Sequence, residues 1–236
     1  MPMHENSIRE AWFIRHSESV ANAGARTREA PTYPLSEFGF RQAADFAGAL
    51  SAEPELIVVS PYTRARQTAE PAIRRFHRAA VEEWPVHEVQ YLAPSLCVDT
   101  TQDDRHALSL EFWERADPHS VAPGAESFAE FIARAADAIG RLSRRRERRV
   151  FVFSHGHFMN AVAWLILTRP GVIDSAAMRR YHRFIHACAV PNCAILPLYL
   201  HPDGACSLGG MWVPDGIGES CGGRAQAGPA DVEPSV

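Results

Sequence analysis

The stretch AWFIRHSESVAN, from Ala11 to Asn22, begins as a short apolar run and then changes abruptly to polar residues. The bulky side chains up to Ile14 are typical of a buried strand. A cation and an imidazole follow directly, as Arg15 and His16, and then Ser17. Because the crevice of an open α/β sheet lies at the carboxyl ends of its strands, this stretch predicts a strand that delivers reactive groups to such a crevice.

Apolar runs and helical patterns alternate through the first part of the chain. Residues 35–50 have apolar side chains at helical spacing, with Ser36 as the expected N-cap. ELIVV at 55–59 reads as a second buried strand, 63–76 as a helix, and 85–89 as a third extended piece. This β-α-β-α-β order predicts an α/β fold with a mostly parallel sheet and helices on its faces.

The middle of the chain is less regular. Residues 90–124 mix aromatic and charged side chains and read as an excursion from the sheet, with one short helix at 105–115. Residues 127–142 then carry apolar side chains at the i, i+3, i+4, i+7 spacing of an amphipathic helix. Ser127 and Glu130 match a capping box, so this helix is predicted to begin there.

The last third of the chain predicts a further strand and helix before a hairpin. VFVF at 150–153 reads as a buried strand, 158–167 as the helix behind it, and 193–213 as two strands around a turn. We find no repeat and no interdomain linker, so we expect one domain over 8–215. Residues 216–236 are rich in Gly, Ala, Pro and Ser and are expected to form a disordered tail.

Composition restricts the possible partners and the compartment. A chain of 236 residues with 46% hydrophobic residues can bury a large core, and its net charge of −4 argues against a general nucleic-acid binder. The longest apolar run, 161–167, is too short to cross a bilayer, and the N-terminus lacks the apolar segment of a secretory signal. Five cysteines without a CxxC pair indicate free thiols, which favours the cytoplasm. These cysteines are Cys97, Cys188, Cys193, Cys206 and Cys221.

Three predicted strands end in reactive polar residues. The first leads to Arg15 and His16, the second to Ser60 and then Arg64, and the later one to His155. If these strands are parallel neighbours, their ends meet at one edge of the sheet. Two of them also lead into helix N-termini, which favour anions. Since guanidinium groups bind phosphate bidentately, the edge predicts a phosphate site.

The spaced motifs resemble the histidine phosphatase (phosphoglycerate mutase-like) superfamily. They are RHSES at 15–19 with Asn22, SPYTRARQTAE at 60–70, Glu88, and FSHGH at 153–157. The resemblance covers most of the chain and implies a three-layer α/β/α sandwich. It also implies that His16 is the nucleophile, attacking phosphorus to form a phosphohistidine, and that Glu88 protonates the leaving oxygen and then activates water. The phosphoryl ligands that it implies are Arg15, Arg64, His155 and Asn22.

Two positions of this pattern leave alternatives open. Glu82 and Glu83 lie near Glu88 and could serve in its place. Ser17 stands where the family usually has glycine, so a side chain there could narrow the pocket or require a different backbone angle.

Three other features have an ordinary reading beside a functional one. His155 and His157 could suggest a metal pair, and His182 and His186 a zinc site on a helix; packing is the preferred interpretation of both. The run RRRERR at 144–149 is interpreted as a solvated helix end rather than an RNA or phosphoinositide patch.

The sequence therefore predicts a phosphomonoesterase that acts on a small phosphorylated substrate through a phosphohistidine at His16. Two arginines and a helix terminus can stabilise the charge that metal ions stabilise elsewhere, so we expect no metal and no other cofactor. A phosphoglycerate-mutase-like phosphotransferase and a catalytically weakened phosphate- or phosphopeptide-binding module remain alternatives. Substrate identity and oligomeric state stay open.

Overall fold

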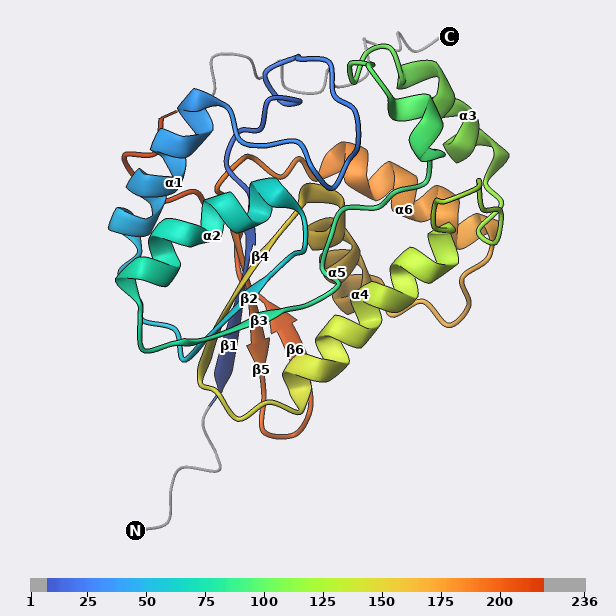
Figure 1. Cartoon of the computed structure of the whole chain (residues 1–236). Helices are drawn as coiled ribbons and strands as arrows, with labels where there is room; N and C mark the ends of the chain where they lie inside the picture. Colours follow the sequence, from blue (N-terminus) through green and yellow to red (C-terminus); the bar gives the residue numbers. More distant parts are fainter. Residues whose placement is uncertain (1–7, 219–236) are drawn as a thin grey trace, which may run out of the picture.

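The computed structural model describes residues 8–218, which build a six-stranded sheet with helices on both faces (Figure 1). The strand order is β3-β2-β4-β1-β5-β6. β1, β2, β3 and β4 pair in parallel, whereas β5 and β6 are antiparallel to their neighbours. The strands are β1 (Arg9–Arg15), β2 (Leu56–Val59), β3 (Ala80–Glu83), β4 (Arg149–Ser154), β5 (Ile195–Leu200) and β6 (Cys206–Leu208).

The helices cover the two faces of this sheet, which makes three layers and confirms the predicted sandwich. Phe46 of α1 and Ala72 of α2 belong to the core on one face. Phe131 of α4, Phe158 of α5 and Tyr181 of α6 belong to the core on the other. The helices are α1 (Glu37–Ala49), α2 (Thr63–Arg75), η1 (Pro94–Cys97, a 3₁₀ turn), α3 (His106–Arg115), α4 (Phe128–Ser143), α5 (Gly156–Thr168) and α6 (Ser175–Ala187).

Local sequence explains where the best-predicted helices begin. The Ser36 side chain accepts a hydrogen bond from the backbone N–H of Gly39 at the start of α1. Ser127 and Glu130 form the predicted capping box at the start of α4. These side chains satisfy N–H groups that the first helical turn leaves unpaired.

The prediction of a strand at 85–89 was wrong, because the third strand is β3, at Ala80–Glu83. Pro85 has no N–H to give to a strand ladder. The Oγ of Ser154 donates to the carbonyl oxygen of Val86 over 2.6 Å. The segment thus satisfies its backbone through side chains instead of through a neighbouring strand.

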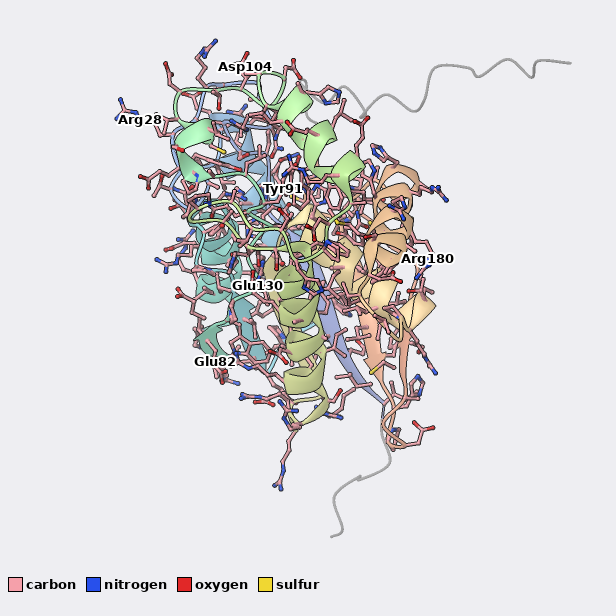
Figure 2. The ribbon with its side chains drawn as sticks, turned by 90° about the vertical axis from the view of Figure 1, so that its right-hand side faces the viewer. Arg28, Glu82, Tyr91, Asp104, Glu130 and Arg180 are labelled. Atoms are coloured by element: carbon pink, nitrogen blue, oxygen red, sulfur yellow. The ribbon has the colours of Figure 1, made fainter. Side chains whose placement is uncertain are left out.

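The predicted excursion lies at the carboxyl end of the parallel strands, as does the loop after β1 (Figure 1). A β-bridge between Thr27 and Thr100 joins that loop to the excursion. In Figure 2, Asp104 lies at the outer end of the excursion, and Tyr91 lies nearer the middle of the molecule. The excursion contains the predicted helix as α3, which begins one residue later than expected.

At the C-terminal end, β5 and β6 form the predicted hairpin. Ile217 packs against the core that α1 and α2 cover. The rest of the expected tail, 219–236, lies outside the described residues, and the domain boundary stays a prediction. Over residues 8–218 we find no helix with the length and apolarity that a membrane crossing needs.

Candidate active site

The described strands confirm that the three predicted strand ends are neighbours. β2, β4 and β1 lie side by side and in parallel, with Val59 paired to Phe153 and Arg15 to Ser154. Their carboxyl ends therefore lie at one edge, where α2 and α5 begin. Helix N-termini supply unpaired N–H groups and a positive dipole end at this edge.

His16 is buried directly after β1, with 4% of its surface exposed. Its Nδ1 lies 2.7 Å from the carbonyl oxygen of Ser17. Since a carbonyl oxygen only accepts, Nδ1 must carry the proton in this contact. The other ring nitrogen, Nε2, accepts a hydrogen bond from the Nε of Arg64 over 3.1 Å. The neutral ring therefore presents its lone pair at Nε2.

The environment keeps the His16 ring neutral. Burial lowers its pKa well below the ordinary value, and the charges of Arg64 and Arg15 lower it further. The hydrogen bond to the Ser17 backbone acts in the opposite direction but is the smallest of these effects. A buried neutral imidazole beside two cations is suited to attack an electrophile that carries negative charge.

Arg64 lies in the first turn of α2 and is almost fully buried, with 1% exposed. Its NH1 donates to the carbonyl oxygen of Ala30 over 2.7 Å. The guanidinium also lies 4.3 Å from the ring centre of Tyr33 and 4.9 Å from that of Tyr62. One backbone acceptor and two aromatic rings thus fix its orientation.

Arg15 lies beside the first residue of α5. Its NH1 donates to the carbonyl oxygen of Val190, while its Nε is buried and has no hydrogen-bond partner among the described residues. A Cβ added to Gly156 would lie 3.6 Å from that Nε. A buried unpaired donor next to a helix N-terminus is the arrangement that an oxyanion satisfies.

His155 is the fully buried N-cap residue of α5. Its ring centre lies 5.1 Å from that of His16, and its Nε2 lies 2.8 Å from the Oγ of Ser60. That hydroxyl also accepts from the backbone N–H of Tyr62. Where it donates its own proton to His155, the ring proton lies on Nδ1, which is buried and has no partner within residues 8–218. Burial, followed by the charge of Arg64, lowers the pKa of His155 well below its ordinary value.

Glu88 is half-buried in the loop after β3 and reaches the N-terminus of α5. One carboxylate oxygen accepts from the backbone N–H of His157, and the other from that of Val89, each over 3.2 Å. Burial lowers the pKa of Arg15, and the charge of Glu88 acts against this shift. Burial raises the pKa of Tyr62, and the charge of Glu88 raises it further. Glu88 therefore lies on the same side of the sheet edge as the two arginines and the two histidines.

The two alternative carboxylates have other partners. Glu82 accepts from the Nε1 of Trp84 over 2.8 Å and pairs with Arg145. Glu83 pairs with Arg66 on the outside of α2. Both belong to strand β3 rather than to the loop that leads to α5, so the geometry favours Glu88.

Asn22 is linked to His16 through one intervening residue, Asn192. Its amide oxygen accepts from the backbone N–H and the hydroxyl of Ser19. The Nδ2 of Asn192 donates to the carbonyl oxygen of His16 over 2.8 Å and lies 3.4 Å from the amide oxygen of Asn22. The amide oxygen of Asn22 is thus occupied, which leaves its NH₂ group as the end that can meet an anion.

The Ser17 side chain contacts Cys193. Its Oγ lies 3.3 Å from the Sγ of buried Cys193, and its N–H donates to the Oγ1 of Thr68 over 3.0 Å. It is absent from the residues with positive φ in the described part of the chain. The side chain therefore faces Cys193, in the segment before β5, and residue 17 needs no glycine-like backbone.

The sequence did not assign a supporting role to Asn192 or Thr68, which contact residues 16 and 17, and it named Ser60 only as a strand-end residue, not as a partner of His155. Their contacts with residues 16, 17 and 155 span 51 to 176 positions along the chain. A local sequence pattern does not show which distant residues such side chains contact. The SPYTRARQTAE motif at 60–70 contains Ser60 and Thr68 and could have drawn attention to them, whereas no motif contains Asn192.

The other candidate features have packing partners. His182 stacks on Trp113 with ring centres 4.9 Å apart, and its Nε2 lies 2.9 Å from that of His186. No group of three or more metal-ligating side chains occurs between residues 8 and 218. In the basic run at 144–149, three arginines pair with carboxylates, as expected for a helix end on the surface rather than a free basic patch.

Known proteins resemble this chain in sequence or in fold. A metal-independent phosphoserine phosphatase of Arabidopsis thaliana is 27% identical over 164 residues, or 67% of this chain and 68% of that protein. The α-ribazole phosphatase of Shigella flexneri superposes with a TM-score of 0.67 at 19% identity, covering 89% of this chain and 98% of that one. A mycobacterial glucosyl-3-phosphoglycerate phosphatase in complex with VO₃ gives 0.67 at 23% identity, covering 88% and 100%. These two likenesses show the fold.

The model of the histidine phosphatase superfamily (branch 1) matches residues 11–192, which include His16, Arg64, Glu88 and His155. The match spans well over half of the chain and runs from β1 into the segment before β5. By this match, the chain belongs to branch 1 of the histidine phosphatase superfamily.

Proposed function

We propose that this protein is a phosphomonoesterase that works through a phosphohistidine at His16. The observation that carries the proposal is the fixed tautomer of His16, whose Nδ1 is bound to the Ser17 carbonyl and whose Nε2 faces the Arg64 guanidinium. This nitrogen is a neutral nucleophile beside a phosphate-binding cation, which is the pairing that phosphoryl transfer to an imidazole needs.

The first step breaks the ester bond. The phosphoryl group binds Arg15, Arg64 and the Nδ1–H of His155, and it gives the buried Nε of Arg15 a partner. Asn22 adds a donor from the loop after β1. The Nε2 of His16 attacks phosphorus, the P–N bond forms, and the P–O bond to the alcohol breaks. Glu88 gives its proton to the leaving oxygen.

The second step returns the enzyme to its first state. Glu88, now a carboxylate, takes a proton from a water molecule, whose oxygen attacks phosphorus. The P–N bond breaks, inorganic phosphate leaves, and Glu88 is protonated again. The charge that develops on the phosphoryl oxygens is stabilised by Arg15, Arg64 and the N-terminus of α5, so the proposal includes no metal.

The substrate class is a small phosphomonoester, and the relatives suggest which esters to test first. The test measures phosphate release from phosphoserine, α-ribazole phosphate, glucosyl-3-phosphoglycerate and p-nitrophenyl phosphate in excess chelator, for the wild type and His16→Ala. We expect chelator-resistant release that His16→Ala abolishes. Release that the chelator abolishes, or that His16→Ala retains, would contradict the proposal. Transfer to a second alcohol faster than to water would indicate a mutase.

A further inference from the structure

The loop that carries Glu88 has no strand partner, yet side chains hold its backbone from both sides. On the N-terminal side of Glu88, the NH1 of Arg134 donates to the carbonyl oxygens of Pro85 and His87 over 2.8 and 2.7 Å. On the C-terminal side, the carboxylate of Glu126 accepts from the N–H of Gln90 over 3.2 Å. The N–H of Glu126 also donates to the carbonyl oxygen of Gln90 over 2.9 Å.

Arg134 and Glu126 are in turn bound to each other. The Nε and NH2 of Arg134 donate to the two carboxylate oxygens of Glu126 over 3.2 and 2.5 Å. Their side chains are 12% and 17% exposed, and the guanidinium packs over the rings of Phe131 and Phe158. A bidentate ion pair that is this well shielded from solvent has a defined geometry, whereas an ion pair on the open surface does not.

This clamp matters because the described structure gives the carboxylate of Glu88 no side-chain hydrogen-bond partner. Its two oxygens accept from the backbone N–H groups of Val89 and His157. The direction of the carboxylate therefore depends on two things: the path of its own backbone and the N-terminus of α5, where His157 lies. That path is held by Arg134 before it and by Glu126 after it.

We propose that Arg134 and Glu126 are positioning residues that aim the Glu88 carboxyl at the leaving-group oxygen. The inference rests on the proposed function, since it assigns the clamp to the proton-transfer step of that reaction. The planar fork of arginine is needed, because three of its nitrogens serve a carboxylate and two carbonyls at once; the point charge of lysine cannot reproduce this pattern.

Two substrates with different leaving groups distinguish a positioning role from a general effect on stability. p-Nitrophenolate is a stable anion and leaves with little help from an acid, whereas an alkoxide needs a proton as it leaves. For Arg134→Met we expect kcat/KM, which reports the step in which the leaving group departs, to fall about 10²-fold on an alkyl phosphate, the loss typical of a 1 Å misplacement. On p-nitrophenyl phosphate we expect kcat/KM to fall less than about fivefold, and the inhibition constant for phosphate should stay unchanged. An equal loss on both substrates would overturn the proposal.

Two milder variants of the same ion pair keep the proposal testable if Arg134→Met does not fold. Arg134→Lys keeps the charge, and Glu126→Gln keeps the shape of the carboxylate; each should show the same leaving-group dependence more weakly. The matched control is Arg141→Met, on the same helix, where the guanidinium lies 3.9 Å from the ring centre of Trp84. It loses an arginine and an aromatic contact but no hydrogen bond to the loop, so its kcat/KM on either substrate should stay within about threefold of wild type.

A double-mutant cycle with Glu88→Gln gives the decisive readout. Once Glu88 has no proton to give, its direction no longer affects the rate. Arg134→Met should then cost less than about threefold on the alkyl phosphate in the Glu88→Gln background. The full 10²-fold loss in that background would overturn the inference. Failure of the proposed function would appear differently, as a wild type that forms no phosphoenzyme.

Discussion

The Nε of Arg64 donates a hydrogen bond to the Nε2 of His16 over 3.1 Å, although the first group is a cation and the second is the proposed nucleophile. The contact keeps the lone pair of the imidazole pointing at the guanidinium that we propose to bind phosphate, and it opposes protonation of the ring. When a phosphoryl group binds, its oxygens can accept from the donors of the same guanidinium, which releases the lone pair of Nε2 for attack. In the proposed mechanism, one residue thus prepares the nucleophile and binds the group that it attacks.

Removal of this guanidinium should be costly. For Arg64→Ala we expect kcat to fall about 10²–10³-fold, by analogy with the loss of one oxyanion-hole donor. The matched control is Arg66→Ala, on the same helix, where the guanidinium pairs with Glu83 at the surface. Steady-state kinetics on one phosphomonoester checks both variants. Activity of Arg64→Ala within about threefold of wild type would remove Arg64 from the site.

The His16 ring should stay neutral well below neutral pH. Its pKa is lowered first by burial and then by Arg64 and Arg15, so protonation near the ordinary histidine value is opposed. Long-range ¹H–¹⁵N NMR of the free enzyme should show the Nδ1–H tautomer, with no titration between pH 7.5 and 5.5. In Arg64→Met, one of the lowering charges is gone, and the pKa should rise. A wild-type ring that titrates near pH 6.5 would contradict this account.

Ser17→Gly should affect stability more than activity. The hydroxyl of Ser17 faces Cys193 rather than His16, and no positive φ requires glycine there. We expect kcat/KM within about threefold of wild type. The free energy of unfolding should fall by about 1 kcal/mol, because glycine gives the unfolded chain more freedom. Urea denaturation checks the second value, and a tenfold or larger rise in activity would show that Ser17 narrows the pocket after all.

His182 should make the fold sensitive to mild acid. Burial, and then the neighbouring His186 and His157, lower its pKa to about 4. Between the unfolded value near 6.5 and this folded value, the unfolded chain binds more protons, so the free energy of unfolding falls as pH falls through that window. Urea denaturation at pH 7.5 and 4.5 should therefore show a larger loss of stability for wild type than for His182→Gln. Equal losses would exclude this contribution.

The sequence predicted the fold wherever a local period or a cap carries the information. The apolar strand before Arg15 and the capping box at Ser127 both appear in the structure as expected. Helix α6 was not predicted as an element, although its signals are present. Asp174 caps it, and Met178, Tyr181 and Ile185 form its buried face at helical spacing.

The segment 85–89 shows what local sequence does not contain. Its apolar residues resemble a strand, but its backbone is held by Ser154 and by Arg134, which lie tens of residues away. The same limit applies to the site. Motif spacing brought His16, Arg64 and His155 to one sheet edge, whereas the contact of Asn192 with the His16 carbonyl depends on tertiary packing alone.

The most direct test of the central claim is to trap the phosphoenzyme. Wild-type protein is mixed with a ³²P-labelled phosphomonoester that it hydrolyses, quenched within milliseconds, digested and sequenced by mass spectrometry. We predict an acid-labile, base-stable label on the Nε2 of His16, which turns over in water and is absent from His16→Ala. A label on another residue, or hydrolysis that proceeds with no label on His16, would contradict the account.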